Sequence, residues 1–323
     1  MRFFYALILS AFAALPARAE VDIQPVTSPG GIDAWLVEEH SIPFVALEIR
    51  FRGGASLDAP GKRGAINLMT GLLEEGAGDM DARAFSRETE ALATNLSFDV
   101  SDDSLSVSAR FLTENRDASI ELLRAALLEP RFDEDAVERV RGQVISNIQS
   151  NQKDPNDIAR QTFDKIAFGD HPYGSSLNGT LETVAGLTRD DLIEAHSAVL
   201  ARDRIYVGAV GDITPEELGK LLDTLLGDLP AKGAPMPPRA EVDIPAGTTL
   251  VDFATPQSVA IFGQPGLAQD DPDWFTATVL NHVLGGGGFE SRLMTEVREK
   301  RGLTYGVYSY LAPRDLAETY LGS

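Results

Sequence analysis

The chain has 323 residues, with 28 Lys and Arg against 49 Asp and Glu, a formal net charge of -21 and no cysteine. Its 43% hydrophobic and 24% charged residues are typical of a soluble globular protein and exclude collagen-like, coiled-coil and wholly disordered chains. The acidic balance argues against nucleic acid or a membrane surface as a partner, and the lack of cysteine excludes disulfides, thiolate metal sites and cysteine nucleophiles.

The first residues have the pattern of a secretory signal peptide. Arg2 precedes an apolar run over 3–15, which is followed by Ala17, Arg18 and Ala19. About 13 apolar residues are too few to span roughly 30 Å of hydrocarbon, so the run does not predict a membrane anchor. We expect residues 1–19 to be removed after Ala19 and the mature protein to be exported to a bacterial periplasm.

Hydrophobic periodicity predicts mixed strands and helices over residues 20–229. Alternating or short apolar runs predict strands at 32–37, 44–51, 96–100, 104–111 and 204–210, with a hairpin turn at Asp102 and Asp103. Apolar residues at helical spacing predict helices at 65–75, 81–93, 116–128, 133–150, 158–168, 188–200 and 214–225.

A proline-rich stretch divides the chain, and the order of elements then repeats. Five prolines lie within 230–247, which predicts a linker. A strand at 258–262, an acidic loop with proline, a helix at 273–284 and a glycine run follow, in the order already seen near 45–78. We therefore predict two similar domains, an internal repeat joined by the linker. The first is 20–229, and the second, 248–323, is truncated by roughly 130 residues.

Several motifs resemble one known family. They are FRGGASLDAPGKRG at 51–64, HPYG at 171–174, VGAVGD at 207–212 and LGGGGFESRLMTEVREKRGLTY at 284–305. Together they are similar to the pitrilysin and mitochondrial processing peptidase (insulinase-like) zinc metallopeptidases. This resemblance covers about 24–323. It implies an α+β fold of two similar α/β-sandwich domains, each an antiparallel-rich sheet packed by helices, which form half of a clam-like chamber that cleaves unfolded peptides.

The same resemblance implies an inverted zinc motif, His-x-x-Glu-His, on the helix after Gly64. In this chain Asn67 and Gly71 stand at the histidine positions and Thr70 at the glutamate position, while Asn147 stands where a further acidic ligand is expected. Neutral side chains of this kind cannot bind zinc as charged ligands or act as a general base. We expect a degenerate zinc site, no cofactor on this chain, and zinc on a partner chain.

Other chemistry has little support in the sequence. His40, His171, His196 and His282 are the only histidines, and no two of them lie within four residues. The sequence contains no Gly-x-Ser-x-Gly elbow and no Walker phosphate loop, and the glycines at 285–288 lack dinucleotide-binding spacing.

Arg298 and Tyr305 are the candidate catalytic residues. By resemblance, this pair lies on the second domain, where Tyr305 would bond the scissile carbonyl oxygen and Arg298 would bind substrate carbonyl groups. Donors placed at that oxygen stabilise a tetrahedral transition state more than the ground state. The alternative is that Arg298 is an exposed cation at a helix end and Tyr305 opens a strand.

Two further features leave alternatives open. Gly285, Gly286, Gly287 and Gly288 are either a helix stop that needs positive φ or a flexible rim that admits peptide substrate. The strands at 104–111 and 258–262 could pair with an extended substrate through backbone groups if they lie at sheet edges.

The resemblance leads to one main functional hypothesis and one alternative. The chain is expected to be the non-zinc subunit of a periplasmic two-chain metallopeptidase, a heterodimer with a homologous subunit that bears the zinc motif. Alone it is expected to be inactive. The alternative is a non-catalytic periplasmic peptide-binding or scaffold protein with the same fold.

Overall fold

The computed structural model describes residues 21–323, so the expected signal peptide and its cleavage site at Ala19 lie outside the described residues. Across the described part of the chain, no helix is both long and apolar enough to cross a bilayer. Two units make up this part. The larger, N-terminal unit ends with α9 (Pro215–Leu226), and the smaller, C-terminal unit begins with β9 (Phe262–Pro265).

The N-terminal unit contains one large sheet and most of the helices. Its strands are β1 (Gln24–Thr27), β2 (Asp33–Glu38), β3 (Phe44–Arg52), β4 (Gly76–Ala77), β5 (Met80–Asp81), β6 (Asn95–Val100), β7 (Ser104–Leu112) and β8 (Ile205–Gly211). Its helices are α2 (Ala65–Thr70), α3 (Ala82–Ala91), α4 (Arg116–Leu128), α5 (Glu134–Asn151), α6 (Pro155–Phe168), α7 (Leu181–Gly186), α8 (Arg189–Val199) and α9. Short 3-10 turns η1 (Gly54–Leu57) and η3 (Pro172–Gly174) complete the site region.

The large sheet has the strand order β1-β2-β8-β3-β7-β6. Only β2 and β8 run parallel; the other neighbours are antiparallel. Alternation decides which side is buried, because successive side chains point to opposite faces. On β3, Val45, Leu47, Ile49 and Phe51 are at most 2% exposed, whereas Glu48, Arg50 and Arg52 are exposed.

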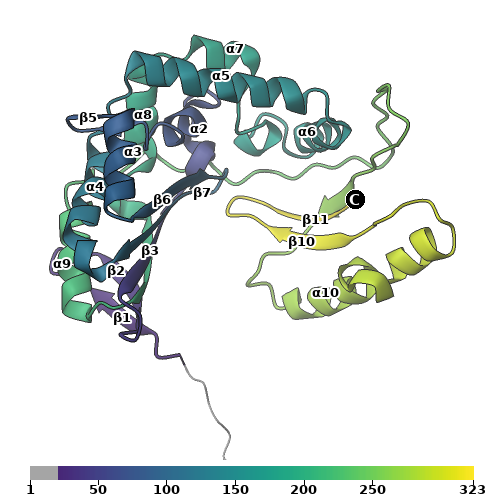
Figure 1. Cartoon of the computed structure of the whole chain (residues 1–323). Coiled ribbons are helices and arrows are strands. Elements are labelled where there is room, and N and C mark those ends of the chain that lie inside the picture. The colour runs from purple at the N-terminus through teal and green to yellow at the C-terminus, as the bar shows by residue number, and fades with distance from the viewer. Residues whose placement is uncertain (1–20) are drawn as a thin grey trace, which may run out of the picture.

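Helices cover one face of this sheet and leave the other open. Figure 1 shows α3, α4, α8 and α9 on one side of the strands, with the C-terminal unit on the opposite side. The main core lies between the sheet and these helices and includes α2 and α5 residues such as Leu68 and Val140. Capping boxes at Thr188 and Thr214 fix the starts of α8 and α9.

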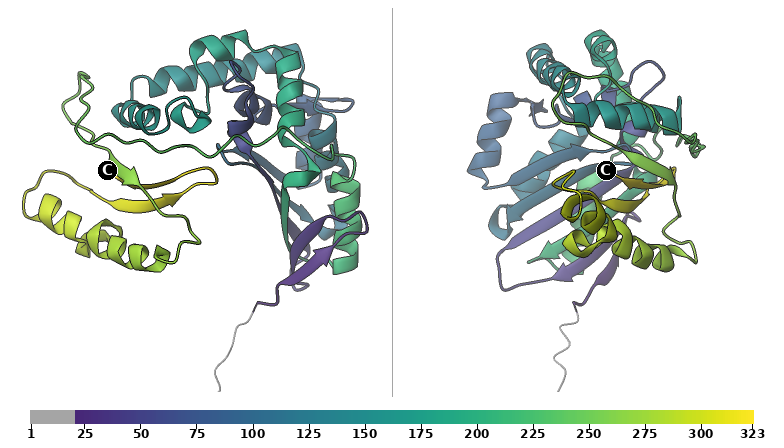
Figure 2. Two further views of the ribbon diagram at one scale, coloured as in Figure 1. Left: turned by 180° about the vertical axis from the view of Figure 1, so that it is seen from behind. Right: turned by 90° about the vertical axis from the view of Figure 1, so that its right-hand side faces the viewer.

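The C-terminal unit repeats part of the larger one. Its elements are β9, α10 (Trp274–Asn281), η5 (His282–Gly286), η6 (Gly288–Glu290), η7 (Met294–Glu299), β10 (Ser309–Pro313) and β11 (Glu318–Gly322), in a sheet of order β10-β11-β9. The hairpin β10-β11 pairs with β9 as the hairpin β6-β7 pairs with β3. This unit has little core of its own, since α10 buries no residue. Both views in Figure 2 show it facing the open side of the large sheet.

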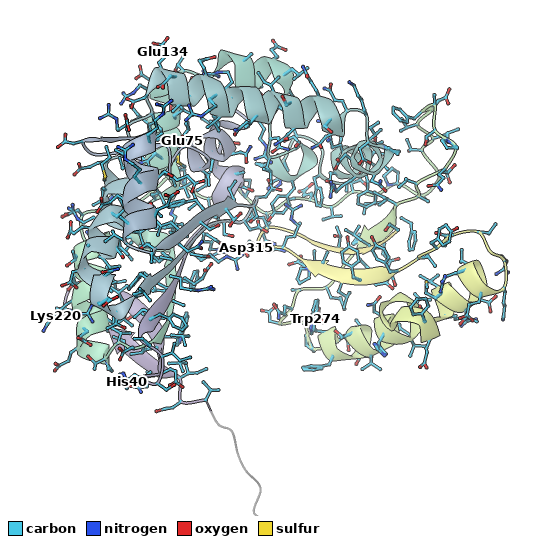
Figure 3. The ribbon with its side chains drawn as sticks, viewed as in Figure 1. His40, Glu75, Glu134, Lys220, Trp274 and Asp315 are labelled. Carbon is cyan, nitrogen blue, oxygen red and sulfur yellow. The ribbon has the colours of Figure 1, made fainter. Side chains whose placement is uncertain are left out.

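The tip of the β10-β11 hairpin joins the two units. Leu316 and Ala317 are buried against Phe168 and Tyr173, together with linker residues Val242 and Ile244. Arg314 stacks its guanidinium 3.3 Å from the centre of the Tyr173 ring and pairs with Asp102 at 2.7 Å. Asp315, labelled in Figure 3 beside the large sheet, pairs with Arg52 at 2.7 Å.

Asp164 on α6 gives this contact a pH dependence. Burial raises the pKa of Asp164 from 3.8 to about 6, although the nearby guanidinium groups of Arg314 and Arg160 act to lower this pKa. The folded chain therefore holds this proton more tightly than the unfolded chain, and stability falls as the pH rises from about 4 to about 6.

We expect Asp164→Asn to raise the free energy of unfolding at neutral pH by on the order of 1 kcal/mol, after allowance for partial exposure. Below about pH 4 the gain should vanish, because Asp164 is then protonated in both states. Denaturant unfolding across this pH range measures the difference. A gain that does not change with pH would contradict the assignment.

Three sequence predictions need correction. The strand at 104–111 lies inside the sheet, between β3 and β6, so it is not free to pair with a substrate. The strand predicted at 258–262 begins instead at Phe262, because only 262–265 pair with β11. The helix predicted at 65–75 is helical only to Thr70 and continues as turns. The β9 strand does lie at a sheet edge, as pairing with a substrate would require. The predicted domain and linker boundaries stay predictions.

Candidate functional site

The degenerate zinc positions lie on α2, where they make contacts within the protein. The Asn67 amide donates to the Asn178 side chain at 3.2 Å. Thr70 is 3% exposed, and its hydroxyl donates to the Ile66 carbonyl at 2.7 Å. Gly71 ends the helix, and a Cβ there would lie 3.2 Å from Val140 on α5. Asn67 and Thr70 are bonded to other residues of the protein, and none of the three positions offers an anionic ligand.

A buried aspartate fixes the start of α2. Asp58 accepts hydrogen bonds from the backbone amides of Gly64 at 2.9 Å and Ile66 at 2.8 Å, because Gly64 has no side chain to cap the helix. Burial raises the pKa of Asp58, whereas these amides and the adjacent Arg63 lower it. Arg63 also pairs with Asp102 at 2.5 Å, which links α2 to the β6-β7 turn and to Arg314.

Asn147 does not join the α2 positions. It lies on an exposed side of α5, and within 21–323 no hydrogen bond connects its side chain to Asn67, Thr70 or Gly71. In the same range, no group of three or more His, Asp or Glu side chains is placed to hold a metal ion. The four positions do not fit zinc, so no chemical step is assigned to a metal on this chain.

The described histidines take part in local contacts. His40 lies on the surface, where hydrogen bonds to Asp212 at 2.8 Å and Glu38 at 3.2 Å raise its pKa. His196 is buried, which lowers its pKa, and its Nε2 donates to the Leu127 carbonyl at 2.8 Å. His40 and His196 therefore make ordinary surface and core contacts within the protein.

Each glycine of the 285–288 run has a structural reason to be glycine. A Cβ on Gly285 would collide with Ser309 of β10, and one on Gly286 would lie 2.6 Å from the Asn281 side chain. A Cβ on Gly287 would lie 2.5 Å from the His282 carbonyl, and Gly288 has φ of 63°. These constraints explain the run by packing. A contact between Gly285, Gly286, Gly287 or Gly288 and substrate stays a prediction.

Arg298 lies in η7 and Tyr305 lies on the segment that connects η7 to β10, so both belong to the C-terminal unit. The Arg298 guanidinium stacks over the Phe289 ring at 4.6 Å, which orients it by a cation-π contact. Tyr305 is 91% exposed, and its hydroxyl has no partner within 21–323. The structure therefore presents one oriented cation and one available hydroxyl, on a different unit from α2.

Comparison with known proteins accounts for both units. Residues 35–181 match the family described as "Insulinase (Peptidase family M16)", and residues 186–320 match "Peptidase M16 inactive domain". The chain belongs to the M16 peptidase family. The sheets with their helices form two M16-type domains, as the resemblance implies, and the two matches meet within α7.

Individual M16 relatives differ in what they are called. The non-peptidase homolog YmxG of Helicobacter pylori is 29% identical over 95% of this chain and 71% of its own length. An uncharacterized zinc protease of Streptomyces coelicolor is 29% identical over 89% of this chain and 64% of its own length. The crystal structure of a peptidase M16 inactive domain from Pseudomonas fluorescens has a TM-score of 0.83 and 27% identity, covering 93% of this chain and 73% of that one.

Sequence reasoning missed the residues that support the site. Phe289 stood inside the quoted motif, and an aromatic residue before Arg298 could have indicated stacking, but eight residues of intervening chain hide the contact. Asp58 stood six residues before Gly64, the glycine that starts α2. An isolated acidic residue ahead of a helix without a capping side chain was the available signal.

Proposed function

We propose that this M16 protein is the non-zinc subunit of a two-chain zinc metallopeptidase that cleaves unfolded peptides, and that it supplies Arg298 and Tyr305. The observation that supports this proposal is a contrast between the two units of the chain. The zinc positions on α2 hold neutral groups bonded to the protein itself, whereas Arg298 is oriented by Phe289 and Tyr305 is exposed. Such a chain lacks the metal chemistry but keeps donors for a carbonyl oxygen.

The role of the two residues follows from the charge that peptide hydrolysis creates. Attack on an amide places negative charge on the carbonyl oxygen, and a Tyr305 hydroxyl that donates to it lowers the barrier. The Arg298 guanidinium would bind neighbouring carbonyl groups and hold the peptide extended. Zinc on the partner chain would polarise the carbonyl and activate water.

The partner is proposed to be a homologous chain with an intact His-x-x-Glu-His motif. Arg298 and Tyr305 lie on the opposite unit from the degenerate α2 positions, which favours a site completed by a second chain. The signal-like residues 1–19 support a periplasmic location, and the net charge of -21 disfavours nucleic acid and membrane surfaces as partners.

A titration tests this proposal. The zinc-motif homologue from the same genome is held at fixed concentration while this chain is added, and hydrolysis of a quenched, unstructured peptide is followed. We expect no turnover by this chain alone and a rate that saturates at one copy per zinc-carrying chain. A rate that equals that of the homologue alone at every ratio would overturn the proposal.

A scaffold role is the second candidate, and one observation favours it. The Helicobacter pylori relative is described as a non-peptidase homolog. If this chain only binds peptide, the titration should leave turnover unchanged while a labelled peptide still binds to the chain and zinc has no effect on that binding.

A further inference from the structure

The open face of the large sheet carries a hollow of about 420 Å³. Its walls and floor include Trp35 of β2, Gly208 and Val210 of β8, Ala46 and Glu48 of β3, and Arg110 of β7. Strand register creates it. Gly208 pairs with Trp35 on one side and Glu48 on the other, and Ala46 pairs with Val210 and Arg110. The small residues Gly208 and Ala46 at the centre of the hollow therefore lie between larger side chains on the neighbouring strands.

The hollow is open and mainly apolar at its β2-β8 end. Trp35 is 53% exposed and Val210 is 46% exposed, and Tyr206, one row further along β8, is 49% exposed. A Cβ built on Gly208 meets no atom within 4 Å, so the space above this strand is free. Exposed apolar side chains gathered around a depression mark a binding surface more often than isolated ones do.

The opposite end of the hollow is basic in an otherwise acidic protein. Arg110 lines it beside Ala46, and Arg50 lies on the same face of the sheet, four residues along β3 from Ala46 and opposite Tyr206. Neither guanidinium has an acidic partner within 21–323. Glu48, the acidic residue between them, accepts a hydrogen bond from Ser108. Two arginines without partners favour a ligand that carries carboxylates.

The chain already binds one of its own carboxylates on this face. Asp315, at the tip of the β10-β11 hairpin, pairs with Arg52, which follows Arg50 in the same outward row of β3. The outward row of β3 that carries Arg50 therefore binds a carboxylate of the protein itself.

We propose that the hollow is a binding site for an unfolded peptide in which a large apolar side chain lies next to acidic residues. The apolar side chain fills the space over Gly208 beside Trp35, and the carboxylates pair with Arg110 and Arg50. This inference rests on the proposed function for the nature of the ligand. It adds a preference for acidic-apolar segments and places it on the N-terminal unit, away from Arg298 and Tyr305.

Trp35 provides a direct readout, because the chain has only two tryptophans. The other, Trp274, begins α10 in the C-terminal unit, away from the large sheet in Figure 3. In a Trp274→Phe background the emission reports on the hollow alone. The probe is a short peptide in which phenylalanine alternates with glutamate, compared with two versions that carry lysine for glutamate or serine for phenylalanine.

We expect a saturable shift of Trp35 emission with the Phe-Glu peptide and binding weaker by about tenfold or more for the other two. Gly208→Leu should fill the hollow and Arg110→Glu should reverse its charge, each weakening binding by a similar factor. The matched controls are Gly142→Leu at an exposed position of α5 and Arg87→Glu at an exposed position of α3. Both should bind the Phe-Glu peptide as the parent protein does.

Several results would overturn the inference. These are no saturable shift with the Phe-Glu peptide, equal binding of the lysine version, or unchanged binding in folded Gly208→Leu and Arg110→Glu. Self-association that Gly208→Leu abolishes, with no peptide effect, would assign the hollow to a second copy. The binding assay contains neither zinc nor a partner chain, so the two proposals can fail separately. If the mixture of chains turns over peptide but the Phe-Glu peptide does not bind to the hollow, only this inference is wrong. If the peptide binds to the hollow but the mixture shows no turnover, only the proposed function is wrong.

Discussion

Replacing Asp58 with alanine is expected to lower the free energy of unfolding by about 3 kcal/mol, the largest stability effect that we predict. The Asp58 side chain is 3% exposed and accepts from the first amides of α2, so its removal leaves two backbone donors without partners. It also removes one of two carboxylates that balance the Arg63 charge.

Denaturant unfolding of the chain measures this loss. Asp79→Ala, at an exposed position, is the matched control and should change stability by less than about 0.5 kcal/mol. Asp58→Asn should lie between the two, because it keeps one acceptor oxygen but loses the charge. If Asp58→Ala is as stable as the control, Asp58 does not hold α2 in place.

Local patterns predicted most of the N-terminal unit. The strict alternation from Leu105 to Phe111 fixed both the strand and its buried face, and the turn at Asp102 and Asp103 fixed the hairpin. Helix boundaries were close where a cap was visible, as at Thr214. Both signals depend only on neighbours within a few residues, which is why a single sequence reveals them.

Features that depend on distant pairing could not be predicted. The inner position of β7 follows from its pairing with β3, some 60 residues earlier. The hollow over Gly208 requires β2, β8 and β3 to come together in one register. The contact of Arg314 with Asp102 joins residues that are more than 200 positions apart. Nothing in the local sequence around these residues specifies their partners.

The candidate site was predicted in part. Arg298 and Tyr305 were found through motif resemblance, and the structure adds Phe289 as the group that orients Arg298. The sequence predicts that the glycine run is either a helix stop or a flexible rim. In the structure, close packing against Ser309 and Asn281 explains why glycine is needed there, and the sequence alone could not predict these contacts.

Tyr305→Phe is expected to have the largest effect on catalysis. In the mixture with the zinc-carrying homologue, kcat should fall by roughly 10² to 10³, the usual loss when one donor to a developing oxyanion is removed. Substrate binding should change little, because the hydroxyl matters mainly when charge builds up on the oxygen. The fold should be unaffected, since Tyr305 is 91% exposed.

The most direct measurement is therefore kcat of the reconstituted mixture with Tyr305→Phe compared with Tyr308→Phe. Tyr308 is a matched control three residues away, 54% exposed and stacked on Tyr310. We predict that Tyr305→Phe loses nearly all turnover while it still associates with the homologue, and that Tyr308→Phe keeps it. Equal turnover for the two variants would contradict the claim that this chain contributes Tyr305 to a shared active site.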